Sequence, residues 1–114
     1  DAEKACRLKA IDGANKIATL IPFQVVETCL EVIGLIDAVA VRGNQNSLSD
    51  AGVAALALGT ACDGAAMNVR INLQGIEDRK WALDLDAKTK ELQDKLHSAR
   101  AKVLKFVETK LQVS

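Results

Sequence analysis

Apolar side chains recur every three or four residues along most of this chain, which predicts helices rather than strands. Four such segments can be read from the pattern: Ala2 to Leu20, Pro22 to Arg42, Ser47 to Gln74 and Glu77 to Leu111. Polar, turn-prone residues separate the second and third segments at Gly43-Asn44-Gln45-Asn46. The pattern therefore predicts an all-α protein, an antiparallel four-helix bundle with short loops, formed by residues 1–114 as a single helical domain.

The boundary between the first two predicted helices is placed at Pro22. The residue before a proline disfavours α geometry, so the first helix is expected to end near Leu20. Proline suits the first position of a helix because its missing N–H has no partner to lose there. The first helix is therefore expected to fold back against the second.

The third predicted helix carries two apolar stripes. One consists of Ala51, Ala55, Leu58, Cys62, Ala66, Val69 and Leu73, and the other of Val53, Leu56, Met67 and Ile71. A helix that is apolar on two sides is either central in its bundle or shared with a partner or a ligand. The fourth helix shows a heptad seam that includes Leu85, Leu92, Leu96 and Val103, and it is the longest of the four.

The cysteines suggest how the central hairpin is held together. Cys29 and Cys62 lie equally far from the hinge, within the apolar arcs of the second and third segments. Shared height and facing sides are what a disulfide requires, so a Cys29–Cys62 bridge clamping this hairpin is predicted. The alternative is a pair of buried free thiols. Cys6 should miss both partners, and is expected to be either an intermolecular bridge or a free thiol.

A ligand-binding site is predicted in the core of the bundle. The small residues of the third segment leave room for a cavity, which Val26, Ile33, Ile36, Leu58 and Val69 would line. Asp37 falls inside the apolar arc of its helix and would be the polar anchor for a ligand. The alternative for Asp37 is a structural ion pair with Lys4 or Arg7 of the first helix, because a buried carboxylate is costly unless it is paired.

No catalytic or cofactor motif is visible in the sequence. His97 is the only histidine, and it projects away from the heptad seam, so it is interpreted as a solvated surface residue. Three cysteines and one histidine have no metal-ligand spacing, and no glycine-rich phosphate loop occurs. We therefore expect no enzyme activity, no metal and no cofactor.

Composition narrows the range of partners. Fifteen basic and fifteen acidic residues cancel, which gives no electrostatic case for binding nucleic acid. The segment from Ile21 to Val41 is long enough to span a membrane but contains Glu27, Glu31 and Asp37, so no transmembrane segment is expected. The start at Asp1 without a methionine is compatible with removal of a signal peptide, and equally with a trimmed chain. A secreted protein is predicted, in keeping with the predicted disulfide.

Two functions fit these features. The first is a small secreted helical carrier that binds a lipid or another apolar ligand in its core. The second is a non-catalytic extracellular structural or interaction module, with a disulfide-linked homodimer as one form, in which a second chain covers the second apolar stripe. Fold alone does not choose between them.

Overall fold

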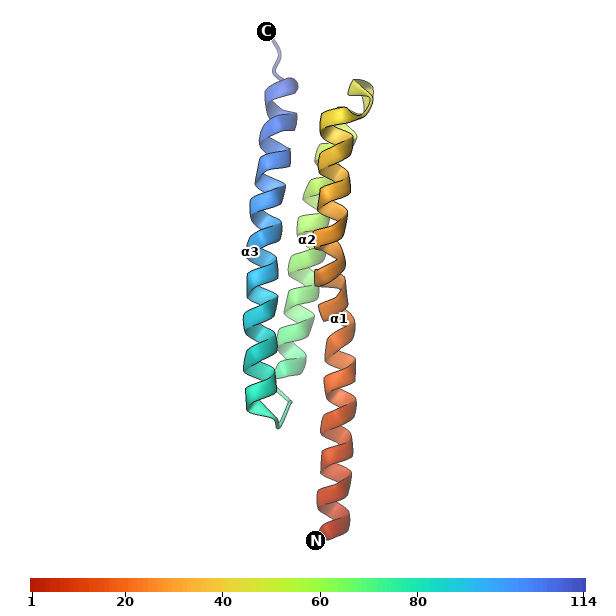
Figure 1. Ribbon diagram of the computed structural model, residues 1–114, viewed down its shortest axis with the longest axis vertical. Coiled ribbons are helices and arrows are strands. Elements are labelled where there is room, and N and C mark those ends of the chain that lie inside the picture. The colour runs from red at the N-terminus through yellow and green to blue at the C-terminus, as the bar shows by residue number, and fades with distance from the viewer.

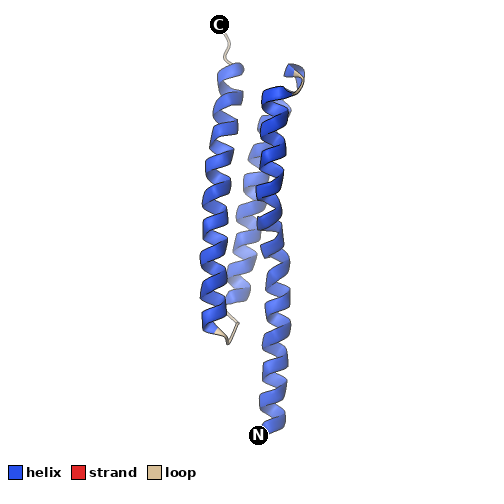
Figure 2. Ribbon diagram, viewed as in Figure 1, coloured by secondary structure: helices blue, strands red, loops and turns tan.

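The structure is a computed structural model that describes all 114 residues and contains three long helices and no strand. These are α1 (Ala2–Arg42), α2 (Leu48–Leu73) and α3 (Arg79–Lys110), with a short 3₁₀ turn, η1 (Gln45–Ser47), between the first two. Successive helices run in opposite directions, and α2 lies between α1 and α3 in the view of Figure 1. Almost all of the chain is helical (Figure 2), so the all-α prediction is confirmed.

The prediction of a four-helix bundle is wrong, because α1 continues through Pro22 without a turn. The buried residues Thr19, Phe23 and Val26 follow one another at spacings of four and three, so one apolar stripe crosses the proline unbroken. The residues around Pro22 also include no glycine, asparagine or aspartate to form a turn. The shared stripe therefore outweighs the local cost of a proline inside a helix.

The N-terminal part of α1 protrudes beyond the other helices as a result (Figure 1). The molecule measures 74 × 18 × 16 Å. Leu8 and Ile11, which a folded-back first helix would have brought against the bundle, are 53% and 49% exposed. Cys6 is exposed on this protruding segment.

The hinge between α1 and α2 forms where it was predicted. Gly43 has an extended backbone, with φ −81° and ψ −176°. A side chain there would collide with the backbone carbonyl of Val39, and this close approach requires glycine. The side chain of Asn44 then accepts a hydrogen bond of 2.9 Å from the backbone N–H of Asn46, which fixes the turn.

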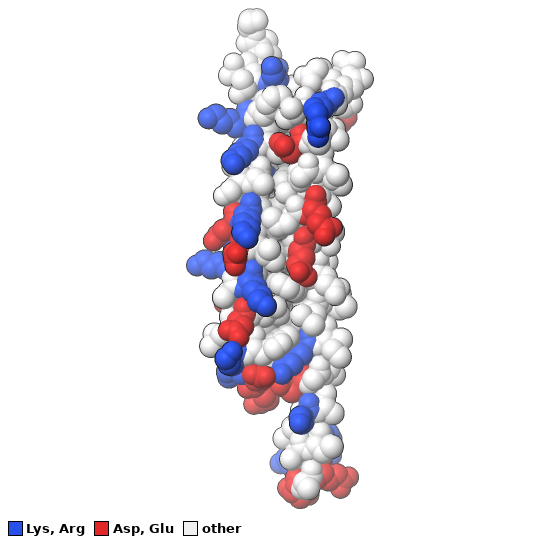
Figure 3. All heavy atoms as spheres, viewed as in Figure 1, with Lys and Arg blue, Asp and Glu red and all other residues white.

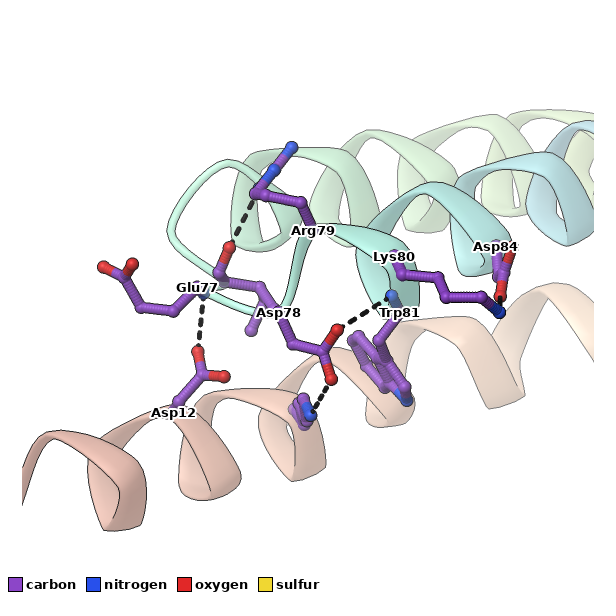
Figure 4. Close-up of polar contacts among 9 residues, drawn as sticks. Asp12, Glu77, Asp78, Arg79, Lys80, Trp81 and Asp84 are labelled. Atoms are coloured by element: carbon purple, nitrogen blue, oxygen red, sulfur yellow. Dashed lines mark hydrogen bonds and ion pairs between the residues drawn. The ribbon is translucent and has the colours of Figure 1, made fainter. Parts of the chain in front are cut away.

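The connection between α2 and α3 is anchored to α1 by polar contacts (Figure 4). Asp78 caps α3 by accepting a bond of 3.2 Å from the Trp81 backbone N–H, and it also forms an ion pair of 2.8 Å with Lys16 of α1. Asp12 of α1 accepts a bond of 2.7 Å from the Glu77 backbone N–H. These contacts fix the height of the turn on α1 and leave the residues before Asp12 without a neighbouring helix.

The core lies along the line where the three helices meet, in two clusters. Near the second turn, Phe23, Val69, Leu73, Ile76, Ala82 and Leu85 pack together. The larger cluster above it joins α1, α2 and α3 through residues that include Val26, Ile33, Ala55, Leu96 and Val103. Thr89 is wholly buried, and its hydroxyl is satisfied by donating to the Leu85 carbonyl at 2.8 Å.

Cys29 and Cys62 meet in the larger cluster, as the hairpin symmetry predicted, but the disulfide predicted between them is wrong. Their side chains are 3% and 0% exposed and hydrogen-bond to each other, yet both are free thiols. Burial, followed by the nearby Cys29 and Asp63, raises the pKa of Cys62 to about 11. A protonated thiol behaves as a small apolar side chain, so the pair packs in the core without a bond.

Candidate functional site

A hollow with four charged residues in its lining runs between α1 and α3, and we call it the charged groove. Its volume is about 500 Å³, and its lining comes from three residues of α1 and five of α3: Ile33, Gly34, Asp37, Asp94, Lys95, Ser98, Ala99 and Lys102. A side chain at Gly34 would meet nothing within 4 Å, so the glycine leaves space on the α1 wall. The volume falls within the range of small-molecule sites.

Four charged groups face this groove. Asp37, Asp94 and Lys102 form no ion pair with any neighbour, whereas Lys95 pairs with Glu91 of its own helix at 3.1 Å. Figure 3 views the side on which α1 and α3 meet, where basic side chains gather along α3 and acidic ones lie across from them on α1. The groove therefore presents unpaired carboxylates and an unpaired ammonium group to the same space.

The residues predicted to bind a ligand in the core do not surround a common cavity. Val26, Ile33 and Val69 are 0%, 4% and 0% exposed and pack against other side chains, while Ile36 and Leu58 are partly buried against the larger cluster. Asp37 is exposed. Of the six, only Asp37 and Ile33 line the charged groove, so the structure separates the predicted polar anchor from most of its predicted apolar lining.

The ion pair predicted between Asp37 and Lys4 or Arg7 is absent. The prediction required the first helix to fold back at Pro22. Because α1 is continuous, Arg7 lies 30 residues from Asp37 on the same helix, or about 45 Å at 1.5 Å per residue. Asp37 instead faces the lysines of α3 across the charged groove.

A second polar cluster connects α2 and α3. One oxygen of Asp63 accepts a hydrogen bond of 2.9 Å from the Gln93 side chain and lies 2.8 Å from Nε2 of His97. Burial raises the pKa of Asp63, but the hydrogen bonds from Gln93 and His97 and the charges of His97 and Arg100 outweigh it, so the pKa lies below its usual value. The arrangement holds an imidazole in a fixed orientation beside a carboxylate.

The interpretation of His97 as an isolated solvated residue is therefore wrong. It is partly buried and paired with a residue 34 positions away. Reading α3 alone could not reveal this, because the contact depends on how α2 packs beside it. One feature of the sequence could have indicated a polar contact here: Asp63 is the only acidic residue within the apolar segment from Ala51 to Leu73.

Next to this cluster, Arg100 lies directly over Gly59 of α2. A side chain at position 59 would collide with the guanidinium group, and Nε of Arg100 is buried without a hydrogen-bond partner. No group of three or more His, Cys, Asp or Glu residues is arranged to hold a metal ion. The chemistry that these sites offer is therefore ionic binding and proton transfer by carboxylate or imidazole.

Comparison with known proteins identifies the class. Residues 1–91 match the family model of formiminotransferase-cyclodeaminase, and the chain belongs to this family. It is similar to the methenyltetrahydrofolate cyclohydrolase of Methylorubrum extorquens, with 41% identity over 109 residues. The match covers 96% of this chain and 51% of that protein, so the chain spans about half the length of the curated relative it matches.

These matches overturn the functional predictions made from the sequence. A carrier for a lipid or apolar ligand, and a non-catalytic extracellular module, are both contradicted by membership in an enzyme family. The expectation that the chain is unrelated to enzymes is likewise wrong. Secretion is tested by none of these observations and stays a prediction.

Proposed function

We propose that this chain forms part of an enzyme that opens the methenyl ring of methenyltetrahydrofolate by adding water. The observation that carries the proposal is the 41% identity to a methenyltetrahydrofolate cyclohydrolase, which extends over 96% of the chain. Because this chain spans only half of that relative, the proposal assigns it a substrate-binding surface. The catalytic groups that this surface lacks are assigned to residues outside the present chain.

The reaction sets clear demands on the protein. The methenyl carbon lies between two nitrogen atoms that share a positive charge, and the oxygen of water bonds to this carbon while the water gives up a proton. One carbon–nitrogen bond then breaks as the hydroxyl group loses its proton and becomes a carbonyl, so the carbon is left as a formyl group. The released nitrogen keeps the electron pair of the broken bond and takes up this second proton. The site must hold a cationic ring next to a proton acceptor and must also accommodate the carboxylates of the folate tail.

The charged groove supplies groups of both kinds. The unpaired carboxylates of Asp37 and Asp94 match the cationic ring and its N–H groups, and either one can accept the proton of the attacking water. Lys95 and Lys102 match the carboxylates of the tail. The apolar part of the lining, Ile33 and Ala99, offers a surface to the flat ring system.

The test is the rate at which the purified chain removes the absorbance of methenyltetrahydrofolate, measured above the uncatalysed rate in the same buffer. D37N and D94N are each expected to lower kcat/KM, by roughly 100-fold for the one that accepts the proton. K102A is expected to raise KM and to leave kcat nearly unchanged. Glu27→Gln is the matched control, since Glu27 is an exposed carboxylate of α1 outside the groove.

The proposal fails if the wild-type chain neither accelerates ring opening nor binds a folate in a calorimetric titration. It also fails for this groove if D37N, D94N and K102A behave like the Glu27→Gln control. In that case the imidazole–carboxylate pair His97–Asp63 is the next candidate for the proton acceptor.

A further inference from the structure

The chain contains seven glycines, and the fold explains four of them. A side chain at Gly43 or Gly59 would collide with a neighbour, a side chain at Gly52 would press on Val107 at 3.0 Å, and Gly75 lies in the turn after α2. The other three lie inside helices, where a side chain would meet nothing within 4 Å: Gly13, Gly34 and Gly64.

Gly34 is the glycine of these three that lines the charged groove. Glycine weakens the interior of a helix, because it loses more conformational freedom on folding than any other residue. No neighbouring atom requires it at position 34, since a side chain would fit there without a clash. Any use of the open space at this position therefore belongs to the groove rather than to the packing of α1.

The middle of the groove is lined by small residues, with charged groups at its ends. On α3, Lys95 and Lys102 are seven residues apart, or about 10.5 Å along the helix axis, and Ser98 and Ala99 lie between them. Gly34 lies across the groove on α1, and Asp37 follows it by about 4.5 Å along the axis, on the same side of the helix. A flat group between these walls would have charged partners at both ends.

We infer that the fused ring of the folate packs against the backbone of α1 at Gly34, which makes Gly34 a specificity-determining residue of the groove. The inference rests on the proposed function. Without a Cβ, the helix backbone can approach a ligand closely, whereas any other residue would hold the ring away from α1. The ring would then lie beside the carboxylate of Asp37, and the tail of the folate would reach the lysines of α3.

A competing explanation is that Gly34 affects only the stability of α1. Gly13 separates the two explanations, because it lies in the same helix and also has open space at its Cβ position. Gly13 does not line the charged groove. If glycine acts only through helix stability, the same substitution at the two positions should have the same effects.

The experiment compares G34A and G34L with the matched controls G13A and G13L. Calorimetric titration with folic acid gives Kd, and the loss of absorbance of methenyltetrahydrofolate gives KM and kcat. G34A is expected to raise Kd and KM by roughly 3- to 10-fold and G34L by roughly 30-fold or more, because the added carbons occupy the space of the ring. G13A and G13L are expected to stay within about twofold of the wild type, as changes outside a binding site do.

Thermal unfolding provides a readout that separates a binding effect from a folding defect. G34A and G13A are both expected to raise the midpoint of unfolding by about 2–5 °C, since alanine stabilises a helix relative to glycine. For G34A, the stability should therefore rise while the affinity for folic acid falls. A folding defect would lower both.

A second ligand tests whether the fused ring is the part that contacts Gly34. N-(4-aminobenzoyl)-L-glutamate carries the carboxylates of the folate tail but lacks the fused ring. Its Kd, measured by ligand-observed NMR, is expected to agree within about twofold between the wild type and G34L, because Lys95 and Lys102 remain in place.

Three results would overturn the inference. If the wild type does not bind folic acid, the inference falls together with the proposed function. If the wild type binds folic acid and the variants at position 34 bind it as tightly as those at position 13, the inference alone is wrong and the proposed function stands. If G34L weakens the tail fragment as much as folic acid, position 34 controls access to the whole groove, and the specific contact with the ring is wrong.

Discussion

At the scale of single residues, the three cysteines differ only in their surroundings. Cys6 is exposed, while Cys29 and Cys62 are buried against each other as thiols. Iodoacetamide at neutral pH is therefore expected to add one label per native chain and three labels per unfolded chain, with no reductant present. Mass spectrometry counts the labels, and a Cys6→Ser variant should take none while native. A single label on the unfolded, unreduced chain would show that Cys29 and Cys62 are bonded after all.

The same thiols are expected to make the stability of the folded chain decrease at alkaline pH. Burial raises the pKa of Cys62 from 9.0 to about 11, and the pKa of Cys29 is raised as well. The folded chain thus holds these protons more tightly than the unfolded chain does. Their contribution to stability is complete below pH 9 and is lost as the pH rises through about 11. Slow labelling of Cys29 and Cys62 should accelerate over this range, while that of Cys6 should follow an ordinary thiol.

At the scale of elements, α1 shows which sequence signals decide a helix boundary. The rule that a helix ends before proline was applied at Leu20, and it failed because the stripe Thr19, Phe23, Val26 continues across Pro22. The buried sides of α2 and α3 could be predicted, since each depends on the spacing of apolar residues within one segment. The meeting of Cys29 and Cys62 could also be predicted, because the two residues lie equally far from one turn. The contact between His97 and Asp63 could not, because it depends on packing between helices.

Pro22 inside α1 is expected to lower the free energy of unfolding, and alanine at this position is expected to raise it again. Pro22 lacks the N–H that would donate to the carbonyl of residue 18, and it lies in the helix interior. Pro22→Ala is therefore expected to raise the free energy of unfolding by about 1–3 kcal/mol. Urea denaturation measures this, at several protein concentrations so that any contribution of association is detected.

Gln24→Ala is the control for this substitution, since Gln24 is exposed two residues further along α1 and should change stability by less than about 0.5 kcal/mol. A lower stability for Pro22→Ala would mean that the proline is required for the packing of α1 on α2.

At the scale of the whole molecule, the outline follows from the continuity of α1. A compact chain of this length has a radius of gyration of about 13 Å, whereas the structure has 18.8 Å. Part of the excess comes from the elongated outline of the three packed helices, and part from the turns of α1 before Asp12, which no other helix covers (Figure 1). The predicted four-helix bundle would have folded these residues back and shortened the molecule. Size in solution therefore distinguishes the two arrangements directly.

Small-angle X-ray scattering from the chain, under conditions where it is monomeric, should give a radius of gyration near 18.8 Å, since a straight α1 keeps the protruding turns away from the centre of mass. A clearly smaller value would mean that α1 bends at Pro22 and that its N-terminal segment folds back along the bundle, as in the predicted four-helix arrangement. In that case the segment would cover exposed apolar residues of α1 and α2 such as Ile21 and Ile71. A value near 18.8 Å would instead show that the buried stripe across Pro22 keeps α1 straight and leaves those residues exposed.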